Sequence, residues 1–235
     1  MLSQKLYAKR IYPIGAILVL AFSILARVLW VGLIPYNDLW ETISSLYNPD
    51  HPEYNPVGAY FFWATMVTAG TLIIIMICYV HPRLVQVKKG FTRFGTFWMV
   101  IGGIGLLLVG LVPQHTLDFI SSKFHEYSAI VGAVGVLFGA GCYGLTVIKG
   151  KIPVNRKLNI GITVMWWTLI ALIVISVAGA YGGINPDWSG QDPIPGVSPF
   201  FSIAIWEKTA FWVMVTYLGL IGALVPDRIE PPKST

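Results

Sequence analysis

Charged residues are scarce in this sequence of 235 residues, of which Asp, Glu, Lys and Arg make up only 11%. Hydrophobic residues make up 55%, and the mean hydropathy is +0.69. Such a chain is surrounded mostly by lipid rather than by water. No stretch leaves room for a separate soluble domain, and no convincing internal repeat occurs. We therefore expect one integral membrane domain over residues 1–235.

Several motifs of enzymes and redox proteins are also missing. The sequence has no glycine-rich loop of the Walker or dinucleotide-binding type, and its two cysteines, Cys78 and Cys142, form no CxxC pair. Both fall inside apolar runs, where free thiols pack as small apolar groups. No two intramembrane histidines face each other as a b-type haem requires. A serine nucleophile in the segments near His125 stays open, although no GxSxG motif supports one.

Six apolar runs are each long enough to cross a hydrocarbon core of about 30 Å, which needs roughly 20 helical residues. We expect membrane spans at residues 12–34, 59–80, 94–112, 124–148, 158–181 and 203–225. The predicted fold is an all-α membrane protein, a bundle of six transmembrane helices.

The few charges sort by the side of the membrane on which their loops fall. One side carries the cations Lys5, Lys9, Arg10, Arg83, Lys88, Lys89, Arg93, Lys149, Lys151, Arg156, Lys157, Arg228 and Lys233. The other side carries Asp38, Glu41, Asp50, Glu53, Asp118, Asp187 and Asp192, with Lys123 as its one clear loop cation. The positive-inside rule predicts that both termini are cytoplasmic. We expect the protein to lie in the plasma membrane. The net charge of +5 then reflects contact with membrane lipids and not with nucleic acid.

The segments on the predicted outer side are longer than those inside. Residues 37–47 have apolar positions at helical spacing and predict a short amphipathic helix on the membrane surface, ended by a proline-rich run. A second, shorter helix of this kind is expected from Thr116 to Phe124. The loop at 182–202 is rich in Gly and Pro and predicts a lid over the outer end of the bundle.

Five ionisable residues lie at or below this outer surface: Arg27, His125, Glu126, Glu207 and Lys208. Arg27 is about eight residues from the end of its span, or roughly 12 Å deep at 1.5 Å per residue. A cation at that depth needs a partner, and Glu207 or Glu126 is the simplest one. The set either holds helices together or lines a ligand pocket.

Small residues recur at steps of three and four along the fourth predicted span. The series is His125, Ser128, Gly132, Gly135, Gly139 and Cys142. This spacing places all of them on one helix face, and such a face lets another helix approach closely. We expect the stripe to face the bundle interior, with His125 at its outer end.

Three of the four histidines, His51, His115 and His125, fall on the acidic side near Asp118 and Glu126. Three imidazoles and a carboxylate suit a divalent metal such as zinc, with one position open for water, so a metal-dependent intramembrane hydrolase is one hypothesis. No HxxxH or HxxE pair supports it, and histidines beside prolines in loops are commonly plain surface groups.

Four short motifs together resemble a known family. They are Ser-Ser-Leu at 44–46, Asn-Pro-Val-Gly at 55–58, Gly-Leu-Val-Pro at 110–113 followed by His125, and Glu207-Lys208. In this order they are similar to a prokaryotic six-span membrane protein family of unknown function, itself distantly similar to the DRAM-like family. The family motif at the last position is Glu-Arg. Lys208 replaces that arginine and cannot form the same bidentate fork with a carboxylate.

Our leading functional hypothesis is an outer-side polar pocket that binds a lipid or another small amphiphile, because the buried charges, predicted surface helices and acidic loops share one end. A small transporter is a further alternative, although the chain is short and lacks a repeat. A structural subunit of a larger membrane complex, or a homo-oligomer, is the last.

Overall fold

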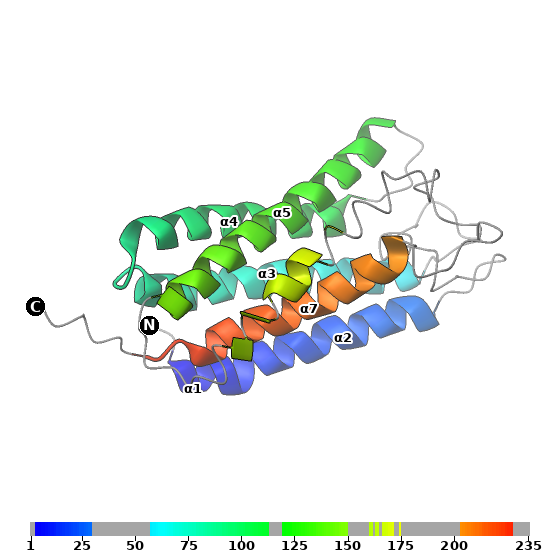
Figure 1. Ribbon diagram of the computed structural model, residues 1–235. Coiled ribbons are helices and arrows are strands. Elements are labelled where there is room, and N and C mark those ends of the chain that lie inside the picture. The colour runs from blue at the N-terminus through cyan, green and yellow to red at the C-terminus, as the bar shows by residue number, and fades with distance from the viewer. Residues whose placement is uncertain are drawn as a thin grey trace, which may run out of the picture.

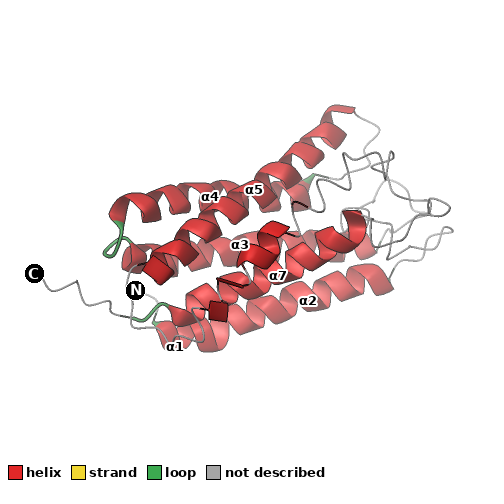
Figure 2. Cartoon of the chain, viewed as in Figure 1, coloured by secondary structure: helices red, strands yellow, loops and turns green. Residues whose placement is uncertain are grey.

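The computed structural model describes residues 3–29, 57–112, 119–149, 160, 161, 163, 164, 166–171, 174 and 203–227. Secondary structure in this described part is entirely helical (Figures 1 and 2). The helices are α1 (Gln4–Leu6), η1 (Tyr7–Ile11), α2 (Tyr12–Val28), α3 (Gly58–Leu84), α4 (Lys89–Leu111), α5 (Phe119–Lys149) and α7 (Ile203–Leu224). The first three elements follow one another without a break, and η1 is one turn of π-helix between α1 and α2.

Four helical stretches are long and apolar enough to cross a membrane: Gln4–Val28, Gly58–Leu84, Lys89–Leu111 and Tyr127–Lys149. They correspond to the first four predicted spans. The chain is therefore a membrane-embedded helical protein. The sixth predicted span is helical as α7, of which Phe211–Leu224 is a shorter apolar stretch. The fifth falls largely outside the described residues, so the count of six spans stays a prediction.

The predicted surface helix at 37–47 and the predicted lid at 182–202 also lie outside the described residues. The second predicted surface helix differs from the structure, because residues from Phe119 onward belong to α5, a single helix of 31 residues. No proline or glycine occurs between Phe119 and Val131 to end a separate short helix.

The described helices run in two opposite directions. Helices α2 and α4 run away from the end of the bundle where α1 lies, and α3, α5 and α7 run back toward it (Figure 1). The backbone N–H of Gln4 donates a hydrogen bond to Oδ1 of Asp227 over 2.5 Å, so the beginning and the end of the described chain meet. We call this end of the bundle, which also contains Lys89 and Lys149, the terminal end. The first and last described residues therefore lie at one end of the bundle, and the cytoplasmic position of this end stays a prediction.

Glycines bring α4 and α5 into direct backbone contact. A Cβ atom on Gly105 would lie 2.6 Å from Cα of Gly132, and one on Gly135 would lie 2.6 Å from the backbone nitrogen of Gly102. Only residues without a side chain permit this approach. Every member of the predicted stripe on α5 is buried: His125, Ser128, Gly132, Gly135, Gly139 and Cys142. The prediction that this face points inward is confirmed.

Aromatic side chains connect α5, α7 and the helical residues between them. Tyr217 on α7 is buried and donates a hydrogen bond over 3.3 Å to the carbonyl of Ala140 on α5. The ring of Trp166 stacks on Tyr217 with centroids 5.9 Å apart, and its edge fills the space beside Gly141. Large apolar residues point outward elsewhere, for example Ile17, which is 63% exposed. Such an outer surface suits lipid rather than water.

Candidate functional site

The five ionisable residues of the predicted outer cluster lie on helices that reach the end opposite the termini (Figure 1). Arg27 is in the last turn of α2 and Lys208 is near the start of α7, and both are partly buried. Glu126 and Glu207 have helical positions on α5 and α7, but their side chains lie outside the described part. The helices thus bring the set to one end, and the pairing of Arg27 with a carboxylate stays a prediction.

A contact of His125 defines a role for this member of the set. Its side chain is 1% exposed, and Nδ1 lies 2.5 Å from the carbonyl oxygen of Val112. A carbonyl only accepts hydrogen bonds, so Nδ1 carries a proton and donates it. Val112 directly follows the last residue of α4, where helical carbonyls lack intrahelical partners. His125 therefore ties the start of α5 to the end of α4.

Two of the three predicted metal ligands, His51 and His115, lie outside the described residues. Within the described ranges, no group of three His, Cys, Asp or Glu side chains is close enough to hold a metal ion. The zinc site and the hydrolase hypothesis that depends on it stay predictions.

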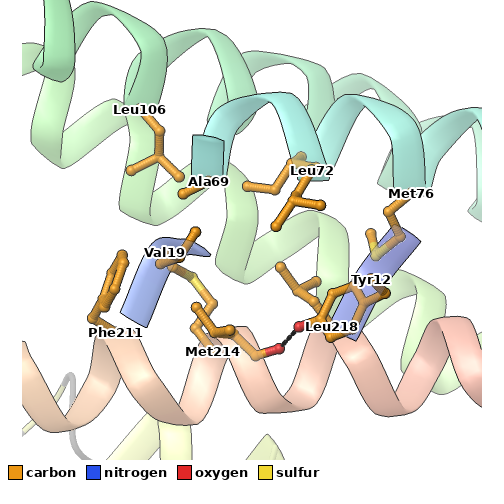
Figure 3. A pocket seen from close by; sticks show the side chains of 11 residues that line it. Tyr12, Val19, Ala69, Leu72, Met76, Leu106, Phe211, Met214 and Leu218 are labelled. Atoms are coloured by element: carbon orange, nitrogen blue, oxygen red, sulfur yellow. Dashed lines mark hydrogen bonds between the residues drawn. The ribbon is translucent and has the colours of Figure 1, made fainter. Parts of the chain in front are cut away.

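A narrow apolar cavity lies between α2, α3, α4 and α7 (Figure 3). Its volume is about 20 Å³, enough for roughly one water molecule. Eleven side chains line it: Tyr12, Val19, Ala69, Leu72, Ile73, Met76, Leu106, Phe211, Met214, Val215 and Leu218. The hydroxyl of Tyr12 donates a hydrogen bond to the carbonyl of Val215, which leaves only apolar atoms to face the rest of the cavity.

This cavity extends along the helices toward the predicted outer cluster. Phe211 lines it, and Lys208 precedes Phe211 by three residues on α7. Three residues of helix correspond to about 4.5 Å and to nearly the same face. Lys208 therefore lies in the helical turn directly beyond the cavity. The sequence reasoning did not find the cavity, because its lining consists of ordinary apolar residues from four separate segments.

A second polar group, which the sequence reasoning missed, occupies the terminal end. Arg83 on α3 is 3% exposed, and its Nη2 atom lies 3.1 Å from Oδ1 of Asp227. Its Nη1 donates to the carbonyl of Tyr79, and its guanidinium lies 3.9 Å from the centroid of the Tyr79 ring. The ring of Tyr7 stacks on the ring of Tyr79, with centroids 4.4 Å apart and an angle of 3° between the rings. We call Gln4, Tyr7, Tyr79, Arg83 and Asp227 the terminal cluster.

The terminal cluster joins the two ends of the chain to α3. The hydroxyl of Tyr79 donates over 2.7 Å to the carbonyl of Val225, and Nε2 of Gln4 donates over 2.8 Å to the carbonyl of Ala223. These two carbonyls belong to the end of α7 and the residue after it, where helical acceptors need outside donors. The arrangement is structural in character. The signal available in the sequence was Asp227 itself, a carboxylate on the mostly basic side.

No curated protein and no solved structure matches the chain. A family model does match, over residues 13–224, and its description is protein of unknown function (DUF998). This match includes all of α2 except its first residue, together with the whole of α3, α4, α5 and α7. It carries no statement about the DRAM-like family, so that likeness stays a prediction. The chain belongs to the DUF998 family of proteins of unknown function.

Proposed function

We propose that this protein is a six-span plasma-membrane protein, with both termini in the cytoplasm, that binds a lipid or another small amphiphile. The apolar part of the ligand enters the cavity between α2, α3 and α7. Its polar part meets the cluster of Arg27, Glu207 and Lys208 at the outer end. The observation that carries the proposal is the apolar cavity, which ends one helical turn from Lys208.

The cavity is narrow when empty, so a chain must displace side chains in order to enter it. Its lining includes Met76 and Met214, whose unbranched thioether side chains adopt several shapes at low cost. Helix α2, which forms one wall, is the least enclosed of the candidate spans, since only 17% of its apolar window is buried. A shift of α2 away from α3 and α7 therefore opens the cavity toward the surrounding lipid.

A photoreactive phospholipid with a diazirine in its acyl chain tests this proposal. We expect it to label residues of α2, α3 and α7 in the purified protein. Ala69→Phe fills the cavity from α3 and is expected to lower this labelling about tenfold, as loss of roughly 1.4 kcal/mol of binding would. Ala133→Phe adds the same ring on an exposed position of α5 and serves as the matched control.

Equal labelling in Ala69→Phe and Ala133→Phe would count against the cavity. If Ala69→Phe does not fold, as judged by its elution in detergent, the smaller Ala69→Val takes its place. The polar end is tested by native mass spectrometry of Arg27→Ala and Glu207→Gln. We expect both to lose the lipid that co-purifies with the unaltered protein, and an unchanged lipid profile in both would remove the polar cluster from the proposal.

A further inference from the structure

A second and larger hollow lies at the terminal end and shares no lining residue with the proposed amphiphile cavity. Its volume is about 360 Å³, within the range of sites for small molecules. It is lined by Lys88, Lys89, Gly90, Phe91, Leu145 and Lys149. These residues come from the start of α4 and the end of α5, and three of the six are cations.

The three lysines are exposed, and no carboxylate of the described residues pairs with them. In the described ranges, none of the three ammonium groups has a hydrogen-bond or ion-pair partner. Asp227 is the one carboxylate described at this end, and it is engaged by Arg83 and Gln4. The hollow is therefore a concentration of positive charge, and anions are attracted to it.

The start of α4 adds backbone donors to this charge. The first turn of a helix has N–H groups without intrahelical acceptors, together with the positive end of the helix dipole. The residue before α4, Lys88, makes no side-chain cap, and no acidic residue lies in the first turn. A Cβ atom on Gly90 would meet nothing within 4 Å, so the backbone there is open to a ligand. Phosphate groups bind at helix starts of this kind.

Apolar side chains also border the hollow. Phe91 lines it and is 42% exposed, and Leu145 lines it from α5. Farther along α4, Phe94 and Phe97 are also exposed, at 52% and 59%. A ligand that places a phosphate among the lysines therefore finds an apolar helix surface leading into the bilayer. We propose that this hollow binds the phosphate of an anionic phospholipid, on the membrane side that the charge pattern predicts to be cytoplasmic.

This site does not depend on the amphiphile cavity, and it is tested separately. The test compares retention of dioleoylphosphatidic acid and dioleoylphosphatidylcholine by native mass spectrometry of the detergent-solubilised protein. The variant is the triple substitution K88Q, K89Q and K149Q. The matched control is K5Q, K9Q and R10Q, which removes three exposed cations from the same end outside the hollow. The thermal unfolding midpoint checks that both variants are folded.

We expect the unaltered protein and the control to retain phosphatidic acid in preference to phosphatidylcholine. The K88Q, K89Q and K149Q variant is expected to lose affinity for phosphatidic acid on the order of 100-fold at low ionic strength, from three lysine contacts. Equal loss in variant and control would overturn the proposal. A further arm uses inorganic phosphate: if it binds in a lysine-dependent way as tightly as the lipid, the hollow is a site for free phosphate and the lipid assignment is overturned.

Discussion

The guanidinium of Arg83 meets the carboxylate of Asp227 across the terminal end of the bundle, with 3.1 Å between Nη2 and Oδ1. The two residues are 144 positions apart, and their burial differs sharply: the arginine side chain is 3% exposed and the aspartate 49%. A buried charge has lost most of its hydration, whereas a half-exposed one keeps much of it. The arginine therefore depends on this pair more than the aspartate does.

Replacing Asp227 tests that dependence. Asp227→Ala leaves Arg83 without this carboxylate and is expected to lower the free energy of unfolding by about 1–2 kcal/mol, less than for a fully buried pair because Asp227 is half-exposed. Asp227→Asn keeps an oxygen for the N–H of Gln4 and is expected to lose less. The measurement is the thermal unfolding midpoint in a mild detergent. Identical midpoints for all three proteins would contradict a stabilising role of the pair.

The hydroxyl of Tyr79 provides a second test in the terminal cluster. Tyr79→Phe keeps the stacking on Tyr7 but removes the donor to the carbonyl of Val225, a residue that is 0% exposed. The expected loss is about 1 kcal/mol of unfolding free energy, as for a typical buried hydrogen bond. Tyr127→Phe changes a side chain that is 64% exposed and is expected to leave the unfolding midpoint unchanged. Similar shifts in the two variants would show that the Val225 bond adds nothing.

Because α4 and α5 are in backbone contact, a single methyl group added between them is expected to lower the stability of the protein strongly. A Cβ atom at position 135 would meet the backbone of Gly102, which cannot move aside as a side chain can. Gly135→Ala is therefore expected to destabilise the protein by about 1–3 kcal/mol. Gly161→Ala adds the same group where nothing lies within 4 Å and is expected to be neutral or to stabilise by up to about 1 kcal/mol. The measurement is the thermal unfolding midpoint of each variant. A midpoint of Gly135→Ala equal to that of the unaltered protein would refute the close approach of α4 and α5.

Enlarging the cavity is expected to have the opposite effect on ligand binding from filling it. Leu72 lines the cavity and is 8% exposed, so Leu72→Ala costs about 2–3 kcal/mol of stability and widens the space. We expect this variant to take up more of the photoreactive phospholipid than the unaltered protein. Leu111→Ala truncates a leucine that is 56% exposed on α4 and serves as control. Greater uptake by the control than by Leu72→Ala would mean that the label reports the outer surface.

Hydropathy located the first four spans but not the true ends of their helices. The apolar run at 59–80 lies inside α3, which spans Gly58–Leu84. The run at 94–112 lies in α4 except for its last residue, since α4 spans Lys89–Leu111. Hydropathy marks the part of a helix that lies in hydrocarbon, whereas backbone hydrogen bonds continue through the polar residues beyond it. Arg83 falls in that extension, and there the sequence reasoning counted it only as a loop cation.

The inward face of α5 was predictable because it follows from the periodicity of a single helix. From His125 to Cys142, small or polar residues recur every three or four positions, which is the helical repeat. The terminal cluster was not predictable in this way. Its members come from the first turn, the end of α3 and the residues after α7, and no local pattern relates positions 144 apart. The apolar cavity was hidden for a related reason, since it depends on how four helices fit and not on any residue type.

The meeting of Gln4 with Asp227 has a consequence for how the protein is made. Helices α4 and α5 follow one another closely in the chain and contact each other along their glycines, so they can pair while the ribosome is still synthesising the rest. The backbone N–H of Gln4 gains its acceptor only later, because Asp227 follows α7 in the chain. Until then, Arg83 also lacks Asp227. A chain that stops before α7 is complete thus leaves the buried guanidinium of Arg83 without this carboxylate, which gives membrane-protein quality control a difference between unfinished and finished copies.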